Sequence, residues 1–145
     1  MCGIIAYNGD KNAIPIILSG LERLEYRGYD SAGIAFINNK LDVIKKAGKV
    51  KELKKNTPVD LDANIGIGHT RWATHGTPSN ENAHPHLSMD KKLAIIHNGI
   101  IENYDVIKEG LKNRGYIFKS ETDTEVLINL IEDVKKNEKI SLFKA

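Results

Sequence analysis

The stretch MCGIIAYNGD, residues 1–10, decides how the chain begins to fold. It places a cysteine directly after the initiator methionine, continues with an apolar run from Gly3 to Ala6, and reaches the turn signal Asn8-Gly9. A short apolar run closed by a turn signal predicts a buried strand. We therefore expect a sheet to hold Cys2 at the start of its first strand.

Downstream of this strand the hydrophobic pattern changes its period. Apolar residues recur at intervals of three and four, which predicts an amphipathic helix beginning at Asp10 or Asn12 and ending near Arg27-Gly28. Pro15 lies early enough in this helix to be tolerated. A loop at 29–31 and a second strand from Ala32 to Ile37 should follow.

The rest of the chain predicts further elements in a definite order. We expect a hairpin partner at 41–46, a short polar helix at 50–56, a strand at 65–69, a long irregular stretch at 70–88, a buried strand at 93–97, and helices at 104–113 and 123–136. The capping box Thr122-x-x-Glu125 opens the last helix. Residues 140–145 look like the start of another element. Strands come mainly first and helices later, which predicts an α+β layered fold.

Length and composition restrict the class of protein. The chain has 145 residues, 41% of them hydrophobic, which predicts one compact domain. The net charge of +2 and the scattered lysine doublets argue against nucleic acid as a partner. No apolar run approaches the ~20 residues of a membrane-spanning helix, and the start of the chain lacks a secretory signal. These features predict a cytoplasmic protein, and a single cysteine without an internal disulfide suits that compartment.

Cys2 is a candidate nucleophile because of its position. Removal of Met1 would leave a thiol and a free α-amino group on the same residue. The α-amine titrates near ~7.7–8.0 and the thiol near ~8.5, so the amine can accept the proton that the thiol gives up. The alternative is a small cysteine buried at a strand edge.

Two further segments carry candidate functional groups. Asn98-Gly99 follows an apolar run, where a side-chain amide and a backbone N–H could stabilise an oxyanion; a hairpin turn is the alternative. The stretch from His69 to Gly76 contains Arg71, whose guanidinium could bind a carboxylate bidentately; the alternative is a solvated surface loop. The five histidines match no zinc-binding spacing, so we expect no metal and no other cofactor.

Taken together, the quoted segments resemble a known family. They are Met1 to Ile4, Leu24 to Gly33, His69 to Gly76, Asn82 to His86, His97 to Asn103 and Ser120 to Glu125. The chain resembles the class II glutamine amidotransferases, which are N-terminal-nucleophile hydrolases, and most closely the glutamine:fructose-6-phosphate amidotransferases. The resemblance covers nearly the whole chain, and residues 26–33 and 71–76 favour this group over related glutaminases.

The resemblance implies a fold and a set of site residues. The fold would be an α+β sandwich of two antiparallel sheets between helical layers. Cys2 would attack the glutamine side-chain amide, and Asn98 with the Gly99 N–H would form the oxyanion hole. Arg71 would bind the substrate α-carboxylate and Asp123 its α-ammonium. The remaining assignments are Thr74 and His75 lining the pocket, Trp72 on a loop that shields the thioester, and Arg27 as support near the nucleophile.

The resemblance also implies partners. The family's glutaminase domain continues beyond residue 145, so residues 1–145 would be its N-terminal part, truncated before a sugar-phosphate isomerase domain, and a homodimer would form through the parent enzyme. L-Glutamine would be the substrate. Two alternatives stay open, namely an inactive binding module and the glutaminase domain of another class II amidotransferase.

Overall fold

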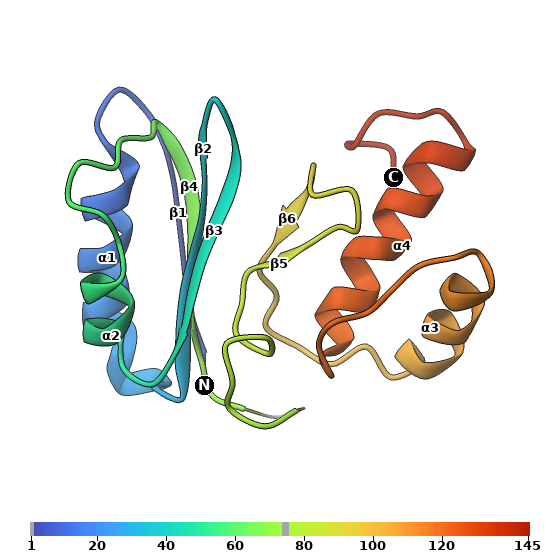
Figure 1. Cartoon of the computed structure of the whole chain (residues 1–145), viewed down its shortest axis with the longest axis horizontal. Coiled ribbons are helices and arrows are strands. Elements are labelled where there is room, and N and C mark those ends of the chain that lie inside the picture. Colours follow the sequence, from blue (N-terminus) through green and yellow to red (C-terminus); the bar gives the residue numbers. More distant parts are fainter. Residues whose placement is uncertain (1, 74–75) are drawn as a thin grey trace.

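The computed structural model describes residues 2–73 and 76–145 and arranges them in layers (Figure 1). Helices α1 (Ala13–Leu24) and α2 (Val50–Lys55) cover one face of a four-stranded sheet. A two-stranded sheet, β5 (His86–Leu87) with β6 (Ala94–Ile95), lies on the other side, and α3 (Tyr104–Asn113) and α4 (Asp123–Asn137) lie beyond it. Two antiparallel sheets between helical layers are the fold that the family resemblance implied, and the α+β order of elements is confirmed.

The larger sheet has the strand order β1-β4-β2-β3, and each neighbouring pair is antiparallel. Its strands are β1 (Gly3–Asn8), β2 (Ser31–Asn38), β3 (Lys40–Ala47) and β4 (Ile65–Arg71). Gly3 of β1 pairs with Thr70 of β4, and Arg71 pairs with Ser31 of β2. The start of β1 and the end of β4 therefore lie at the same edge of the sheet.

Helix α1 packs closely against this sheet. Asn12, one of the two expected caps, begins the helix by accepting a hydrogen bond from the Ile14 N–H at 3.0 Å. A Cβ at Gly68 of β4 would lie only 2.4 Å from Ile17 Cγ2, so a glycine is needed for the helix to approach. The apolar core between helices and sheet includes Ile17, Leu21, Ile34 and Leu53, all completely buried.

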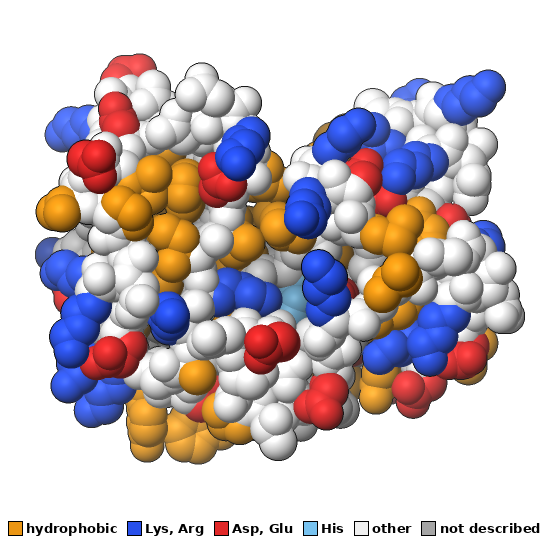
Figure 2. Space-filling model, in the orientation of Figure 1, with side chains coloured by type: hydrophobic (Ala, Val, Ile, Leu, Met, Phe, Trp, Pro, Cys, Tyr) orange, Lys and Arg blue, Asp and Glu red, His pale blue; other side chains and the backbone are white. Residues whose placement is uncertain are grey.

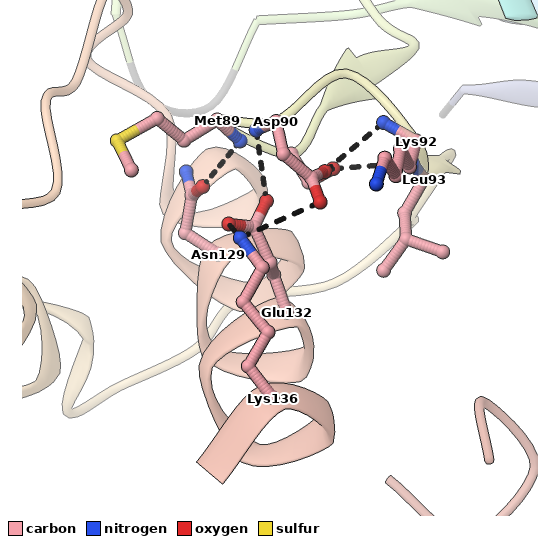
Figure 3. Close-up of polar contacts among 8 residues, drawn as sticks. Met89, Asp90, Lys92, Leu93, Asn129, Glu132 and Lys136 are labelled. Atoms are coloured by element: carbon pink, nitrogen blue, oxygen red, sulfur yellow. Dashed lines mark hydrogen bonds and ion pairs between the residues drawn. The ribbon is translucent and has the colours of Figure 1, made fainter. Parts of the chain in front are cut away.

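Helix α4 anchors the connection between β5 and β6 (Figure 3). Asn129 Oδ1 accepts a hydrogen bond from the Met89 N–H at 2.8 Å, and Glu132 Oε2 accepts one from the Asp90 N–H at 3.0 Å. Lys136 Nζ pairs with Asp90 Oδ2 at 3.4 Å. These contacts hold the chain just before the segment that carries Asn98.

Some of the expected boundaries were wrong. The strand expected at 93–97 is only Ala94–Ile95, and it is half-buried, because its partner β5 is equally short and Pro85 has no N–H to extend the pairing. The strand expected at 65–69 continues to Arg71. Residues 141–145 form a turn, with the Lys144 N–H bonded to Ser141 O at 3.0 Å, where another element was expected to start.

The far face of the larger sheet borders a hollow. Figure 2 shows the molecule hollowed between the sheet and α4, with hydrophobic side chains beside the hollow. The cavity there measures about 370 Å³, and its wall includes Phe36, Ile65, Ile95, Ile131 and Leu142. Among the described residues, no helix is both long enough and apolar enough to cross a membrane.

Candidate active site

Cys2 lies where β1 begins, half-buried at the sheet edge. The backbone N–H of Trp72 donates a hydrogen bond to Cys2 Sγ at 3.2 Å. The next residue, Gly3, donates from its N–H to Thr70 Oγ1 at 3.1 Å. An N–H directed at a sulfur stabilises the negative charge of a thiolate. The end of β4 therefore both positions and polarises the thiol.

Asn98 approaches Cys2 from the segment after β6. Its Nδ2 donates to the backbone carbonyl of Cys2 at 3.3 Å, and its Oδ1 lies 2.7 Å from Nε2 of His69. Asn98-Gly99 is therefore not a hairpin turn between strands but a loop beside Cys2. The amide nitrogen of Asn98 therefore lies beside the residue that carries the thiol.

Two charged side chains of opposite sign enter the same region. Arg71, the last residue of β4, is 4% exposed, and its guanidinium donates to Gly76 O at 3.1 Å. Asp123, the first residue of α4, is 5% exposed and accepts a hydrogen bond from the Ile101 N–H at 2.7 Å. A guanidinium and a carboxylate in one pocket suit a ligand that carries both a carboxylate and an ammonium group.

One cavity of about 340 Å³ contains most of the expected site residues. Its wall includes Cys2, Arg27, Arg71, Trp72, Asn98, Gly99 and Asp123. Thr74 and His75, also expected at the site, lie outside the described residues. A larger cavity of about 530 Å³, on the side of β3 and α4, contains none of the expected residues.

An aromatic pair lies beside the cavity, and one of its members, Trp72, lines it. Trp72 is half exposed, and its indole makes an edge-on contact with Tyr29, with the ring centroids 5.6 Å apart. Gly28 lies against the backbone here, since a Cβ at Gly28 would come within 2.9 Å of the Arg71 carbonyl carbon. Gly28 and Tyr29 thus both lie against the Arg71-Trp72 segment, and their residue types fit its local geometry.

Sequence reasoning missed the role of Asp30. Its carboxylate accepts a hydrogen bond from the Ala73 N–H, and its backbone N–H donates to Arg71 O at 3.1 Å. The Ser31 hydroxyl also donates to Asp30 Oδ1 at 2.8 Å. Asp30 therefore ties down the backbone on both sides of Trp72. The signal that could have indicated this role is the position of Asp30 directly before β2, opposite the end of β4.

The histidines behind the site were considered only as metal ligands. His69 and His84 stack with their centroids 4.4 Å apart, and His86 meets His84 edge-on at 4.6 Å. Burial lowers the pKa of His69 to about 4 and lowers the pKa values of His84 and His86 well below the usual range. The three rings are neutral at neutral pH. Within the described part of the chain, no group of three or more His, Cys, Asp or Glu side chains could hold a metal ion.

Comparison with known proteins gives consistent matches. A family model described as a glutamine amidotransferase domain matches residues 55–141. The chain is 57% identical to a glutamine–fructose-6-phosphate aminotransferase (isomerizing) of Bacteroides thetaiotaomicron, covering 100% of this chain and 24% of that protein. A protein of the same name from Aquifex aeolicus is 59% identical, with 90% of this chain and 22% of the relative covered. The chain spans about a quarter of the length of these relatives.

Solved structures agree with the fold. A glutamine phosphoribosylpyrophosphate amidotransferase from B. subtilis, complexed with ADP and GMP, superimposes with a TM-score of 0.81 at 31% identity, over 99% of this chain and 31% of that one. A structure described as the allosteric regulatory enzyme of purine biosynthesis gives 0.83 at 32% identity, with the same coverage of both chains. The family model matches more than half of the residues of this chain, and the solved structures share its fold. The chain therefore belongs to the glutamine amidotransferase domain family.

Proposed function

We propose that this chain hydrolyses the side-chain amide of glutamine to glutamate and ammonia through a thioester on Cys2. The observation that carries the proposal is the position of Asn98, whose amide nitrogen lies beside the residue that holds the thiol. The Trp72 N–H at 3.2 Å from Cys2 Sγ supports the nucleophile. A covalent thioester divides amide hydrolysis into two easier steps.

The proposed steps use groups within one cavity. After removal of Met1, the α-amine of Cys2 takes the thiol proton while Sγ attacks the glutamine amide carbon. The oxygen of that amide becomes an oxyanion, stabilised by Asn98 Nδ2 and the Gly99 N–H, and such a donor contributes about 2.7–4 kcal/mol. The amine then gives this proton to the amide nitrogen, the C–N bond breaks as ammonia leaves, and water attacks the thioester to release glutamate and restore the thiol.

Substrate binding is assigned to the charged groups. Arg71 would bind the α-carboxylate, and Asp123 would bind the α-ammonium with the carboxylate oxygen that does not accept from Ile101. Trp72 would cover the thioester, and Arg27 would support the pocket beside Cys2. Thr74 and His75 stay part of this proposal from the resemblance alone.

We further propose that residues 1–145 are the N-terminal part of the ammonia-supplying domain of a glutamine:fructose-6-phosphate aminotransferase. Identities of 57% and 59% to proteins of that name, against 31% and 32% to the purine-pathway structures, favour this assignment over another class II amidotransferase. A sugar-phosphate isomerase domain and a second copy of the parent enzyme would be its partners, and the cytoplasm its location.

The test is glutamate release by the 145-residue chain, with and without a glutamine-analogue alkylator. We expect glutamate and ammonia in equal amounts, complete inhibition by one equivalent of alkylator, and the label on an N-terminal peptide that begins with Cys2. Glutamate release that survives full labelling would contradict the thioester. Binding of glutamine without release would instead favour the binding module.

The chain should not make glucosamine 6-phosphate from fructose 6-phosphate and glutamine, because no described segment offers a phosphate-binding glycine motif. Mass spectrometry of a reaction with both substrates checks this expectation. Amino sugar above a no-protein control would contradict the assignment of residues 1–145 to the ammonia-supplying part alone.

A further inference from the structure

His69 lies directly behind the proposed oxyanion donor. It is the fifth residue of β4 and is 1% exposed, with its ring stacked on that of His84. Its Nε2 lies 2.7 Å from Asn98 Oδ1. Its ring borders the cavity that contains Cys2, and its Nδ1 is buried without a hydrogen-bond partner among the described residues, which leaves Nε2 as the ring atom that bonds to Asn98.

The two contacts of the Asn98 amide determine which end faces which partner. The carbonyl oxygen of Cys2 can only accept, so the end of the amide 3.3 Å from it must be the nitrogen. The other end is therefore the amide oxygen, which also can only accept. His69 Nε2 must then carry a hydrogen.

We propose that His69 is a positioning residue, whose Nε2–H holds the Asn98 amide with its NH₂ group toward Cys2. The inference rests on the proposed glutaminase function and adds to it the reason why the oxyanion donor does not turn over. An amide turned by 180° would direct its oxygen at the Cys2 carbonyl and at the developing oxyanion, which would repel both. A neutral ring with its single hydrogen on Nε2 prevents this.

The tautomer gives a test that does not depend on activity. Long-range ¹H–¹⁵N spectra of the ¹⁵N-histidine-labelled chain at pH 7.5 should show His69 with a protonated Nε2 and a bare Nδ1. Assignment comes from the signals that His69→Gln removes. A hydrogen on Nδ1 instead would overturn the proposal.

Two substitutions of similar size separate hydrogen bonding from packing. His69→Gln can present an amide N–H near the position of Nε2, whereas His69→Met fills similar space without a donor. We expect His69→Gln to keep kcat within about threefold and His69→Met to lower kcat about 10- to 100-fold, less than the ~10²–10³ for loss of the donor itself, with KM within about twofold in both. Equal loss of kcat in the two variants, or a change in KM alone, would overturn the proposal.

The same variants separate this inference from the glutaminase proposal. If the wild-type chain releases no glutamate, the glutaminase proposal fails, and the side-chain NH₂ signals of Asn98 decide the positioning role. We expect one set of these signals in the wild type and in His69→Gln, and a second set in His69→Met from the turned amide. One unchanged set in all three proteins would overturn the role of His69.

Discussion

Residues 2–71 and residues 82–137 bury different kinds of side chain. The first half buries mainly apolar groups, such as Ile17, Leu21 and Leu53, between two helices and a sheet. The second half buries many polar groups, including Asn129 and Glu132 of α4, each with hydrogen-bond partners on the backbone. Apolar packing has no preferred direction, whereas each polar contact does.

The proposed active site lies where these halves meet, and the difference suggests a division of labour. The apolar half supplies Cys2 and Arg71 from neighbouring strands of one sheet. The polar half supplies Asn98 and Asp123, each oriented by hydrogen bonds. The first half thus acts as a rigid scaffold for Cys2 and Arg71. Hydrogen bonds in the second half orient Asn98 and Asp123 toward that scaffold.

The largest effect should follow from replacing the proposed nucleophile of the first half. Cys2→Ala should lower glutamate release by roughly 10⁴-fold or more, because no other described thiol can form the thioester. The melting temperature should stay close to that of the wild type, since Cys2 is half-buried and outside the apolar core. Residual turnover near the wild-type rate would place the chemistry elsewhere.

The second-largest effect should follow from lowering the pH, which should destabilise mainly the polar half. The unfolded chain protonates its histidines near pH 6.5, whereas burial holds the folded pKa of His69 at about 4 and those of His84 and His86 far below 6.5. The unfolded state thus binds more protons, and stability that is full above pH 6.5 is lost as the pH falls toward 4.

Each histidine should cost about 1.4 kcal/mol per pH unit, so the free energy of unfolding should fall by up to about 4 kcal/mol between pH 7.5 and 5.5. Urea unfolding at the two pH values measures the change. Hydrogen exchange should show the loss first in residues 82–97. Equal stability at both values would mean that the rings are accessible to protons in the folded protein.

Asn98→Ala tests whether the polar half orients an oxyanion donor toward Cys2. Removing the donor should lower kcat about 10²- to 10³-fold with little change in KM, because an oxyanion exists only in the transition state. Asn113→Ala, at the exposed end of α3, serves as the matched control and should keep full activity. A raised KM with an unchanged kcat would assign Asn98 to substrate binding instead.

Arg71→Lys should give the smallest effect and the opposite kinetic pattern. Loss of a bidentate contact should raise KM about 10- to 100-fold and change kcat less, because the α-carboxylate is remote from the reacting bond. Arg114→Lys is the control, since Arg114 pairs with Asp133 at 3.2 Å outside the cavity. A large fall in kcat at constant KM would argue against carboxylate binding.

Much of the fold could be predicted from sequence because local signals mark its elements. Helix α3 has the expected bounds, Tyr104–Asn113, and Gly115 follows it with a φ of 91°, a backbone conformation that glycine adopts readily. Thr122 caps α4 by accepting from the Glu125 N–H at 3.4 Å, as the capping box requires.

The other half of that box was not predictable. The Glu125 carboxylate accepts from the Ser120 N–H at 2.7 Å and from the Ser120 hydroxyl, whereas the Thr122 N–H donates to Ser120 Oγ. A local pattern cannot show such competition between partners. The strand β5 was missed and β6 was expected to be longer, because the extent of each depends on pairing with the other, and that pairing stops at Pro85.

The candidate site shows a similar limit. Residue types and family resemblance singled out seven residues that line the cavity, yet neither assigned a positioning role to Asp30 or to His69, which also lines it. Both act through residues distant in sequence, since Asp30 binds the Ala73 N–H and His69 contacts Asn98. Sequence separations of 43 and 29 residues lie beyond any local pattern.

The end of β4 also limits how such a chain can diverge. Gly68 and Thr70 face α1 and β1, whereas His69 and Arg71 face the cavity, because side chains alternate along a strand. Inserting or deleting one residue before His69 would exchange these roles and turn the guanidinium toward the helix. A substitution can therefore change one position of this strand at a time. An insertion or deletion of an odd number of residues within it would exchange the residues on its two faces. Relatives that keep the chemistry should place their insertions in the 56–64 connection and leave the parity of β4 unchanged.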